Sequence, residues 1–495
     1  MPTAIVEEDR LVALDVTRTS RLGSQRDQRH PSVGVVQALE SFIFWGLTLM
    51  VCSAPWLYGG QSPYVLGWLT VGLAALGLLW SVKSALEGAI RLLWSPIHTL
   101  FGAFVILGVV QGLPLPMAIR SIGTETDLLG VGSASWKWIT MNPQATGEIV
   151  WRLIVLFAYF LLVTAVMRTR RQVRALMWVL IISGCAISVV ALMNRVAPEK
   201  ALLWRFDGES LAFGPFANRA HFAAFIELVM PFAVAFLAAS PRRRDFWPIV
   251  GVAVLLMSVA VVLSASRAGV VLIVLEVLVL IVLSGRKRVR WLVIGLGLAL
   301  GVAGVVWLTT EGAFERILRR FTEETLVFSP GSPTTRLTIW STTLTMIADQ
   351  PLLGVGLGAF DVAYPRYDAG NGLQLTAHAH NEFLHVVSET GVVGGLMSLL
   401  FLLSGVRIGR RALRQADAEL RPPAFAAAVG CGALAIHSLV DVPLHVMANA
   451  LAFLSAMAVL LVIERMSAVS RPSLSASAPN HPAALARQEV SHADL

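Results

Sequence analysis

Twelve apolar runs, each close to the length that crosses a lipid bilayer, limit what this chain can fold into more than any other feature of its sequence. A membrane-spanning helix needs about 20 mainly apolar residues. The runs that meet or nearly meet this length lie at 35–54, 63–82, 96–113, 150–167, 175–193, 221–239, 247–265, 268–285, 291–309, 392–407, 423–440 and 446–463. Charged residues make up 14% of the sequence, against about 25% in soluble proteins. The sequence therefore predicts an all-α polytopic membrane protein with about 12 transmembrane helices.

Arginine and lysine are concentrated in the short loops that follow even-numbered runs. The clusters occupy 168–174, 242–244, 286–290 and 407–414, and the segment before the first run is also rich in arginine. Because such clusters stay on the cytoplasmic side of a membrane, the pattern predicts that both termini are cytoplasmic. The net charge of +8 is then mostly a topological signal, so no nucleic-acid partner is expected.

The same reasoning divides the chain into five parts. A cytoplasmic N-terminal tail is expected at 1–34, without the apolar stretch of a removable signal peptide. Transmembrane helices 1 to 9 follow at 35–309, a large loop on the opposite side of the membrane at 310–391, and helices 10 to 12 at 392–463. Residues 464–495 are rich in Ser, Ala and Pro, which predicts a disordered cytoplasmic tail. Long loops are uncommon without a functional reason, so chemistry is expected in the large loop.

The large loop contains helical patterns and a glycine-rich turn. Apolar residues at helical spacing in "EGAFERILRRF", at 311–321, predict an amphipathic helix on the membrane surface. A second helix is predicted at about 335–348, stopped by Pro351. The run "GVGLG" at 354–358 has no strand before it, so it predicts close packing of the backbone rather than a nucleotide site.

The loop ends in the stretch "HAHNEFLHVVSETGVVG". Asn381 is placed to cap a helix that begins at Glu382, and Gly391 fits the position just after the last turn of that helix. The sequence therefore predicts a short helix, with His378 and His380 directly before its positive end.

The clustered histidines could have more than one chemical role. His380 and His385 would lie about 140° apart around a helix, which excludes shared metal ligation of the zincin kind. Three interpretations stay open: a metal site built from His378, His380 and Glu382 on extended chain, plain helix capping, and proton transfer or anion binding by an imidazole.

Two arginines lie on the side of the membrane that the positive-inside bias disfavours. Arg219 is at the outer mouth of the sixth run, and Arg267 lies between the seventh and the eighth. A guanidinium stays charged and can bind phosphate through two hydrogen bonds, so both are candidates for holding an anionic group. Arg336 in the loop is a third candidate, and anchoring to lipid headgroups is the alternative. Four further ionisable residues in apolar runs are expected to support packing or the site: Glu227, Glu276, His437 and Asp441.

At these positions the sequence resembles the O-antigen ligases and O-antigen polymerases, a superfamily of bacterial membrane glycosyltransferases. The ligase pattern of His-Asn, nine residues and Gly-x-x-Gly falls on His380, Asn381, Gly391 and Gly394. The segment "RLTIWSTTLTMIADQPLLGVGLGAF" is similar to the arginine–tryptophan helix and glycine turn of the family. "FANRAHFAAF" and "SASRAG" are similar to two further family segments. The resemblance covers about 200–410.

The resemblance implies a GT-C-like fold with a large periplasmic loop, and an inverting, metal-independent reaction without a cofactor. A glycan would move from an undecaprenyl-diphosphate carrier to an acceptor hydroxyl, of lipid A–core or a similar molecule, on the periplasmic side of the bacterial inner membrane. The lipid bilayer, the lipid-linked donor and the acceptor would be the partners, as in lipopolysaccharide biosynthesis. Polymerisation of O-antigen or exopolysaccharide is the alternative. A polysaccharide transporter or flippase is less favoured, because no inverted repeat is visible.

The expected roles divide between catalysis and substrate binding. His380 is the expected general base, and Arg219 and Arg267 are expected to stabilise the leaving diphosphate. Substrate binding is expected at seven further residues: Arg336, Asn381, Glu382, His378, His221, Asn218 and Tyr367. No metal ligand is expected.

Overall fold

A computed structural model describes residues 31–116, 136–196, 212–239, 247–284, 333–368 and 376–469. The α-helices are α1 (Pro31–Ser53), α2 (Pro63–Glu87), α3 (Pro96–Gly112), α5 (Pro143–Val166), α6 (Arg170–Val196), α7 (Arg219–Ala239), α8 (Trp247–Ser264), α9 (Arg267–Ser284), α12 (Pro333–Asp349), α13 (Phe360–Ala363), α14 (Glu382–Gln415), α15 (Arg421–His437) and α16 (Met447–Val469). Short 3-10 turns are η1 (Ala54–Trp56), η2 (Tyr58–Gly60), η5 (Tyr364–Arg366) and η6 (Pro443–His445). In the described chain, two short strands, β1 (Pro114–Pro116) and β2 (Trp136–Trp138), pair antiparallel. The predictions for 291–309 and 311–321 lie outside the described residues.

The predicted all-α, membrane-spanning class is confirmed. Eight described helices are long and apolar enough to cross a bilayer: α1, α2, α5, α6, α7, α8, α14 and α16. The helix α3 is apolar but shorter. Every predicted apolar run within the described ranges coincides with a helix. The total of about 12 spans stays a prediction.

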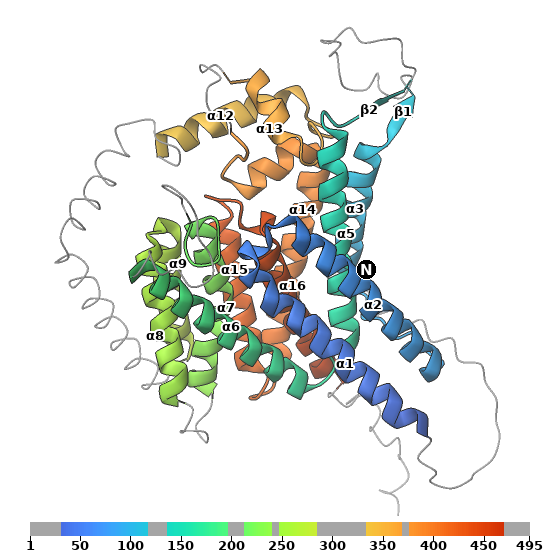
Figure 1. The fold of residues 1–495 in the computed structure, drawn as a ribbon, viewed down its shortest axis with the longest axis vertical. Coiled ribbons are helices and arrows are strands. Elements are labelled where there is room, and N and C mark those ends of the chain that lie inside the picture. The colour runs from blue at the N-terminus through green and yellow to red at the C-terminus, as the bar shows by residue number, and fades with distance from the viewer. Residues whose placement is uncertain are drawn as a thin grey trace, which may run out of the picture.

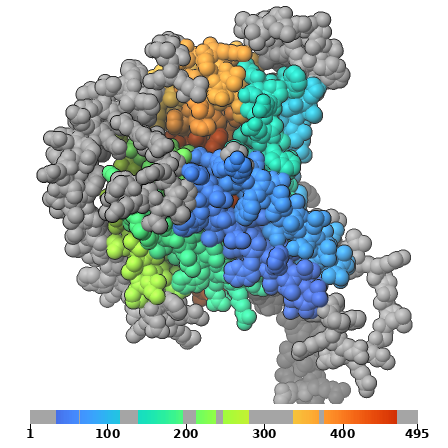
Figure 2. Space-filling model, viewed as in Figure 1, coloured from blue at the N-terminus to red at the C-terminus, as the bar shows by residue number. Residues whose placement is uncertain are grey.

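The bundle is built around α7 and α16. In both helices 89% of the residues in the apolar window are buried, against 22% in α2. The helix α7 packs against α6, α8, α9, α15 and α16, so it has protein neighbours on most sides. In Figure 1 α1 and α2 cross the front of the bundle, and Figure 2 shows their blue atoms covering part of that face. The central helices are therefore the ones on which buried polar groups can be held.

The long helix α14 joins two segments that the sequence predicts as separate. A short helix is predicted from Glu382 and a transmembrane helix from 392, but one helix, α14, runs through both and is broken at Gly391. The backbone of Gly391 has φ 63° and ψ −166°, a conformation open essentially only to glycine. The predicted end of the large loop at 391 therefore falls at a break inside a helix.

The glycine-rich turn after α12 supplies hydrogen bonds to this break. The backbone N–H of Val355 donates to the carbonyl oxygen of Ser388 (3.0 Å), and that of Gly356 donates to Glu389 (2.9 Å). A Cβ atom added to Gly354 would lie 2.4 Å from the carbonyl carbon of Glu389. The predicted role of the glycines, close packing of backbone, is confirmed.

Contacts between helix ends give the bundle two distinct poles. At one pole Arg170, at the start of α6, pairs with Glu419 in the connection from α14 to α15 (2.9 Å). At the other pole the backbone N–H of Glu382, at the start of α14, donates to the carbonyl oxygen of Ser438, just after α15 (2.8 Å). Figure 1 shows α12 and α13 beyond this second pole. The described arginine clusters and the start of α14 therefore lie at opposite ends of the molecule.

Candidate active site

His380 and Asp441 form an imidazole–carboxylate pair at the start of α14. The Nδ1 atom of His380 lies 3.5 Å from Oδ1 of Asp441, and 32% of the His380 side chain is exposed, against 5% of the Asp441 side chain. Burial raises the pKa of Asp441, but the hydrogen bond to His380 and the nearby imidazoles outweigh it, so the pKa is lowered overall. A carboxylate at Nδ1 favours the tautomer that leaves Nε2 able to accept a proton.

The backbone of His380 supports a positional role. Its φ of 47° is left-handed, which is uncommon for a residue other than glycine. Strained backbone of this kind persists only where the surroundings fix it, and it is concentrated at functional sites. The next residue, Asn381, caps α14: its Oδ1 accepts from the N–H groups of Phe383 (3.0 Å) and Leu384 (3.1 Å). The predicted cap is confirmed. It fixes where α14 begins, and therefore where His380, the residue before the cap, is held.

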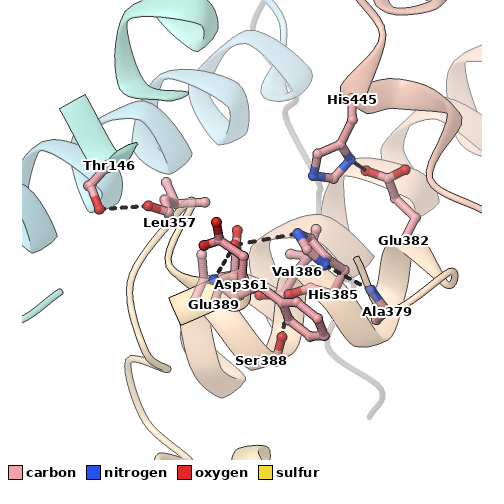
Figure 3. A network of polar contacts seen from close by, with 12 residues as sticks. Thr146, Leu357, Asp361, Ala379, Glu382, His385, Val386, Ser388, Glu389 and His445 are labelled. Atoms are coloured by element: carbon pink, nitrogen blue, oxygen red, sulfur yellow. Dashed lines mark hydrogen bonds and ion pairs between the residues drawn. The ribbon is translucent and has the colours of Figure 1, made fainter. Parts of the chain in front are cut away.

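Three other histidines lie close to one another near this pair. Nitrogen atoms of His378, His385 and His445 all lie within 4.8 Å of one another. Glu382 contacts His445 (Oε1 to Nδ1, 3.2 Å), and Glu389 contacts Nε2 of His385 (3.4 Å). Figure 3 shows Glu382 and His445 pointing toward each other, with His385 and Glu389 on the neighbouring turns of α14. Glu382 and Glu389 therefore each hold one of the rings.

The pKa values in this cluster move in opposite directions. Burial, followed by the neighbouring imidazoles, lowers the pKa of His378 to about 2. Burial also lowers the pKa of His445, but the Glu382 carboxylate outweighs it and the pKa is raised overall. His378 is therefore neutral at physiological pH, with a lone pair available on its ring.

The first turn of α7 is linked to the turn that carries His445. Asn218 Oδ1 accepts from the N–H of Ala220 (2.9 Å) and so caps the helix that Arg219 begins. His221 is buried, and neither of its ring nitrogens has a hydrogen-bond partner among the described residues. The side chain of Asn449, on α16, donates to the carbonyl oxygen of His221 (3.2 Å). The same side chain also donates to the carbonyl oxygen of Pro443 (3.2 Å), so Asn449 joins the helix that Arg219 begins to the turn that carries His445.

The second predicted phosphate ligand begins the adjacent helix. Arg267 is the first residue of α9 and is exposed. Two residues later, a Cβ atom on Gly269 would lie 2.5 Å from Cβ of Ala223, so the first turns of α9 and α7 are in close contact. Both arginines thus begin helices at the pole where His380 lies.

Arg336 and Trp340 lie one turn apart on α12. The Nε1 atom of Trp340 donates to the carbonyl oxygen of Ala379 (2.9 Å), which ties α12 to the residue before His380. Residues four apart share a helix face, so Arg336 lies on the same side. Its Nε atom is buried without a hydrogen-bond partner in the described chain.

Tyr367 is placed differently from the other predicted site residues. Its hydroxyl donates to Oδ2 of Asp349, at the end of α12, over 2.5 Å. Burial and this carboxylate raise the pKa of Tyr367 to about 12. The contacts therefore assign Tyr367 to the packing of η5 on α12, and no described contact joins it to the histidines.

Two residues of the site carry little signal in the sequence. The sequence does not single out His445, and it predicts only a supporting role for Asp441. Both lie in "VDVPLH", a short polar break between two apolar runs, which was the one available sign. Deeper in the bundle, the expected support residues Glu227 and His437 pair with each other over 3.0 Å.

The fold and the site define a class: a multi-pass membrane protein with imidazole–carboxylate pairs and two helix-initiating arginines at one pole. Residues 252–399 match the protein family described as O-Antigen ligase. This match supports the resemblance to the O-antigen ligases and polymerases over that region. The matched region includes Arg267, Arg336 and His380, whereas Arg219 and Asp441 lie outside it.

One comparison concerns solved structures. A chain from the structure described as "Structural coordination of polymerization and crosslinking by a peptidoglycan synthase complex" is 18% identical. The similarity covers 75% of the present chain and 97% of that chain, with a TM-score of 0.41. No match to a curated protein was found.

Proposed function

We propose that this chain is an inverting, metal-independent glycosyltransferase of the O-antigen ligase type. It moves a glycan from undecaprenyl diphosphate to an acceptor hydroxyl, of lipid A–core or a similar molecule, on the periplasmic side of the bacterial inner membrane. The observation that carries this proposal is the pair of His380 and Asp441 at the pole where Arg219 and Arg267 begin α7 and α9. The family match over 252–399 supports the reaction class.

The reaction is a single displacement at the anomeric carbon of the donor sugar. The acceptor oxygen forms a bond to this carbon while the bond from the carbon to the diphosphate oxygen breaks. The leaving diphosphate takes the electron pair, and Nε2 of His380 takes the hydroxyl proton. Attack from the face opposite the leaving group inverts the anomeric configuration. A positioned general base of this kind contributes about 10²–10⁴-fold in rate.

Fixed positive groups can stabilise the diphosphate as its charge grows. Arg219 and Arg267 are the first residues of their helices, where the backbone N–H groups also favour an anion. Guanidinium groups keep their charge and bind phosphate oxygens in pairs. Arg336, one turn from the tryptophan that holds Ala379, is a third cation for the donor.

The orientation of the chain in the membrane follows from the two poles. We place the pole that bears His380 on the periplasmic side and the tails, 1–34 and 464–495, in the cytoplasm. Support comes from the arginine-rich start of α6 and end of α14, which lie at the opposite pole.

Reconstitution with defined substrates tests the proposed reaction. The purified protein is placed in liposomes with an undecaprenyl-diphosphate-linked glycan and either lipid A–core or a second lipid-linked glycan. We expect transfer to lipid A–core, detected as a larger glycolipid. Transfer only to the second lipid-linked glycan would assign a polymerase, and absence of transfer to both acceptors would contradict the proposal.

Replacing Arg267 by lysine should clearly impair glycan transfer. An ammonium group keeps the charge but cannot form the paired contacts that a guanidinium makes with phosphate. The initial rate of transfer is measured against that of Arg171→Lys, the same change on α6 at the other pole. Equal rates for the two variants would show that Arg267 is only a membrane anchor.

Replacing Asp441 by asparagine should lower kcat by up to about 10⁴-fold, the loss seen when the carboxylate that orients a catalytic histidine becomes an amide. KM should stay within about twofold, because Asp441 contacts His380 rather than substrate. Asp417→Asn, at the opposite pole, serves as the matched control. A change confined to KM would rule out the positioning role.

A further inference from the structure

Three imidazoles from three separate segments converge behind the proposed base. His378 lies on extended chain before α14, His385 lies one turn into α14, and His445 ends η6. Their ring centroids are 4.7–5.5 Å apart, and one nitrogen of each lies within 4.8 Å of the others. Neutral imidazole is the commonest metal ligand in proteins. In many zinc sites three histidines supply all of the protein ligands.

The surroundings of the three rings fit a metal site. His378 Nδ1 is buried and has no hydrogen-bond partner in the described chain, so its ring offers an unused ligand atom. Glu382 contacts His445, and Glu389 contacts His385, over 3.2 and 3.4 Å. Carboxylates placed on the second nitrogen of a histidine orient the ring and strengthen it as a ligand.

The three ligand nitrogens need to move only slightly closer together to bind one ion. Bonds of about 2.1 Å from Zn²⁺ to nitrogen keep two ligand atoms of a tetrahedral site about 3.4 Å apart. Rotation of the side chains has to shorten the widest of the present separations by about 1.4 Å at most. His385 now receives the N–H of Ala379 at Nδ1 (3.3 Å) and contacts Glu389 at Nε2, so the ion replaces one of these two contacts.

We propose that His378, His385 and His445 bind a divalent transition-metal ion of the Zn²⁺ class, with water or a neighbouring carboxylate as the fourth ligand. The ion links the segment before α14 to α14 itself and to η6. It holds in place the residues directly before His380, beside the tie from Trp340 to Ala379. Its role is structural, so the proposed transfer reaction needs no metal at the reacting atoms, and the metal proposal stands independently of that reaction.

Metal content and affinity of the purified protein test the site. The full-length chain is isolated in detergent with an affinity tag that contains no histidine, and is then titrated with Co²⁺ while its visible absorbance is followed. We expect one ion per chain, displaced by Zn²⁺. His378→Gln and His445→Gln should each weaken binding more than about 100-fold, and Glu382→Gln about 10–100-fold, as expected for an orienting partner. His98→Gln, a change at a buried histidine on α3, should leave binding intact.

Two results would overturn the site. One is that the wild-type protein binds no Co²⁺ or Zn²⁺ at micromolar free ion. The other is that both histidine variants bind as tightly as the wild type. Should a variant fail to fold, X-ray absorption of the Zn²⁺-loaded wild type decides instead: about three imidazole ligands support the site, and one or none contradicts it. Because no glycan is involved, a protein that transfers glycan but binds no metal would refute this inference and leave the proposed function standing.

Discussion

Replacing His380 by alanine should lower the rate of glycan transfer by about 10²–10⁴-fold, the contribution of a positioned general base. The fold should persist, because the His380 side chain is partly exposed and, among the described residues, Asp441 is its polar partner. The measurement is the initial rate of transfer in liposomes, with thermal unfolding of the same preparation as the check on folding.

A second variant separates the base from the backbone conformation. Asparagine tolerates a left-handed φ and can donate a hydrogen bond to Asp441, but it cannot accept the hydroxyl proton. His380→Asn should therefore be as inactive as His380→Ala while keeping the stability of the wild type. More than about a tenth of normal transfer in His380→Asn would remove the general-base assignment from this residue.

Replacing Gly391 by alanine should destabilise the protein strongly. The backbone conformation of Gly391, with φ 63°, costs other residues about 1–3 kcal/mol. An added Cβ would also lie 2.2 Å from the carbonyl carbon and oxygen of Leu352. These are backbone atoms and cannot rotate away, so either the break in α14 or the glycine-rich turn must move. We expect a lower thermal-unfolding temperature, a lower yield and loss of transfer.

Gly77 provides the matched control for this substitution. It lies in α2, and a Cβ added there meets no atom within 4 Å. Gly77→Ala should leave stability unchanged or raise it by up to about 1 kcal/mol, because alanine favours a helix more than glycine does. Similar losses in both variants would mean that the conformation at Gly391 is not what makes glycine necessary there.

The features that were predicted well depend on residues close together in the sequence. The helix expected at about 335–348 is observed as Pro333–Asp349, since its apolar spacing and the following proline are local signals. The cap at Asn381 and the break at Gly391 depend on a few neighbouring residues in the same way. The apolar runs coincide with helices because the length of a span is set by the bilayer.

The features that were missed depend on contacts between distant segments. Asp441 reaches His380 across 61 residues of sequence, and no spacing rule relates them. Gln111, at the end of α3, donates from Nε2 to the carbonyl oxygens of Leu353 (2.7 Å) and Glu389 (2.9 Å), yet in the sequence it is one polar residue closing an apolar run. The histidine cluster was hidden for the same reason, since His445 joins it from a turn between two helices.

The break in α14 also makes this helix depend on segments that are distant in the sequence. Helix-breaking residues are tolerated in membrane helices where neighbouring groups satisfy the freed backbone, and here those groups belong to the turn at 351–358 and to α3. The carbonyl oxygens of Ser388 and Glu389 gain these hydrogen-bond partners only where the distant segments pack together, so the helix that follows His380 is completed by the tertiary fold.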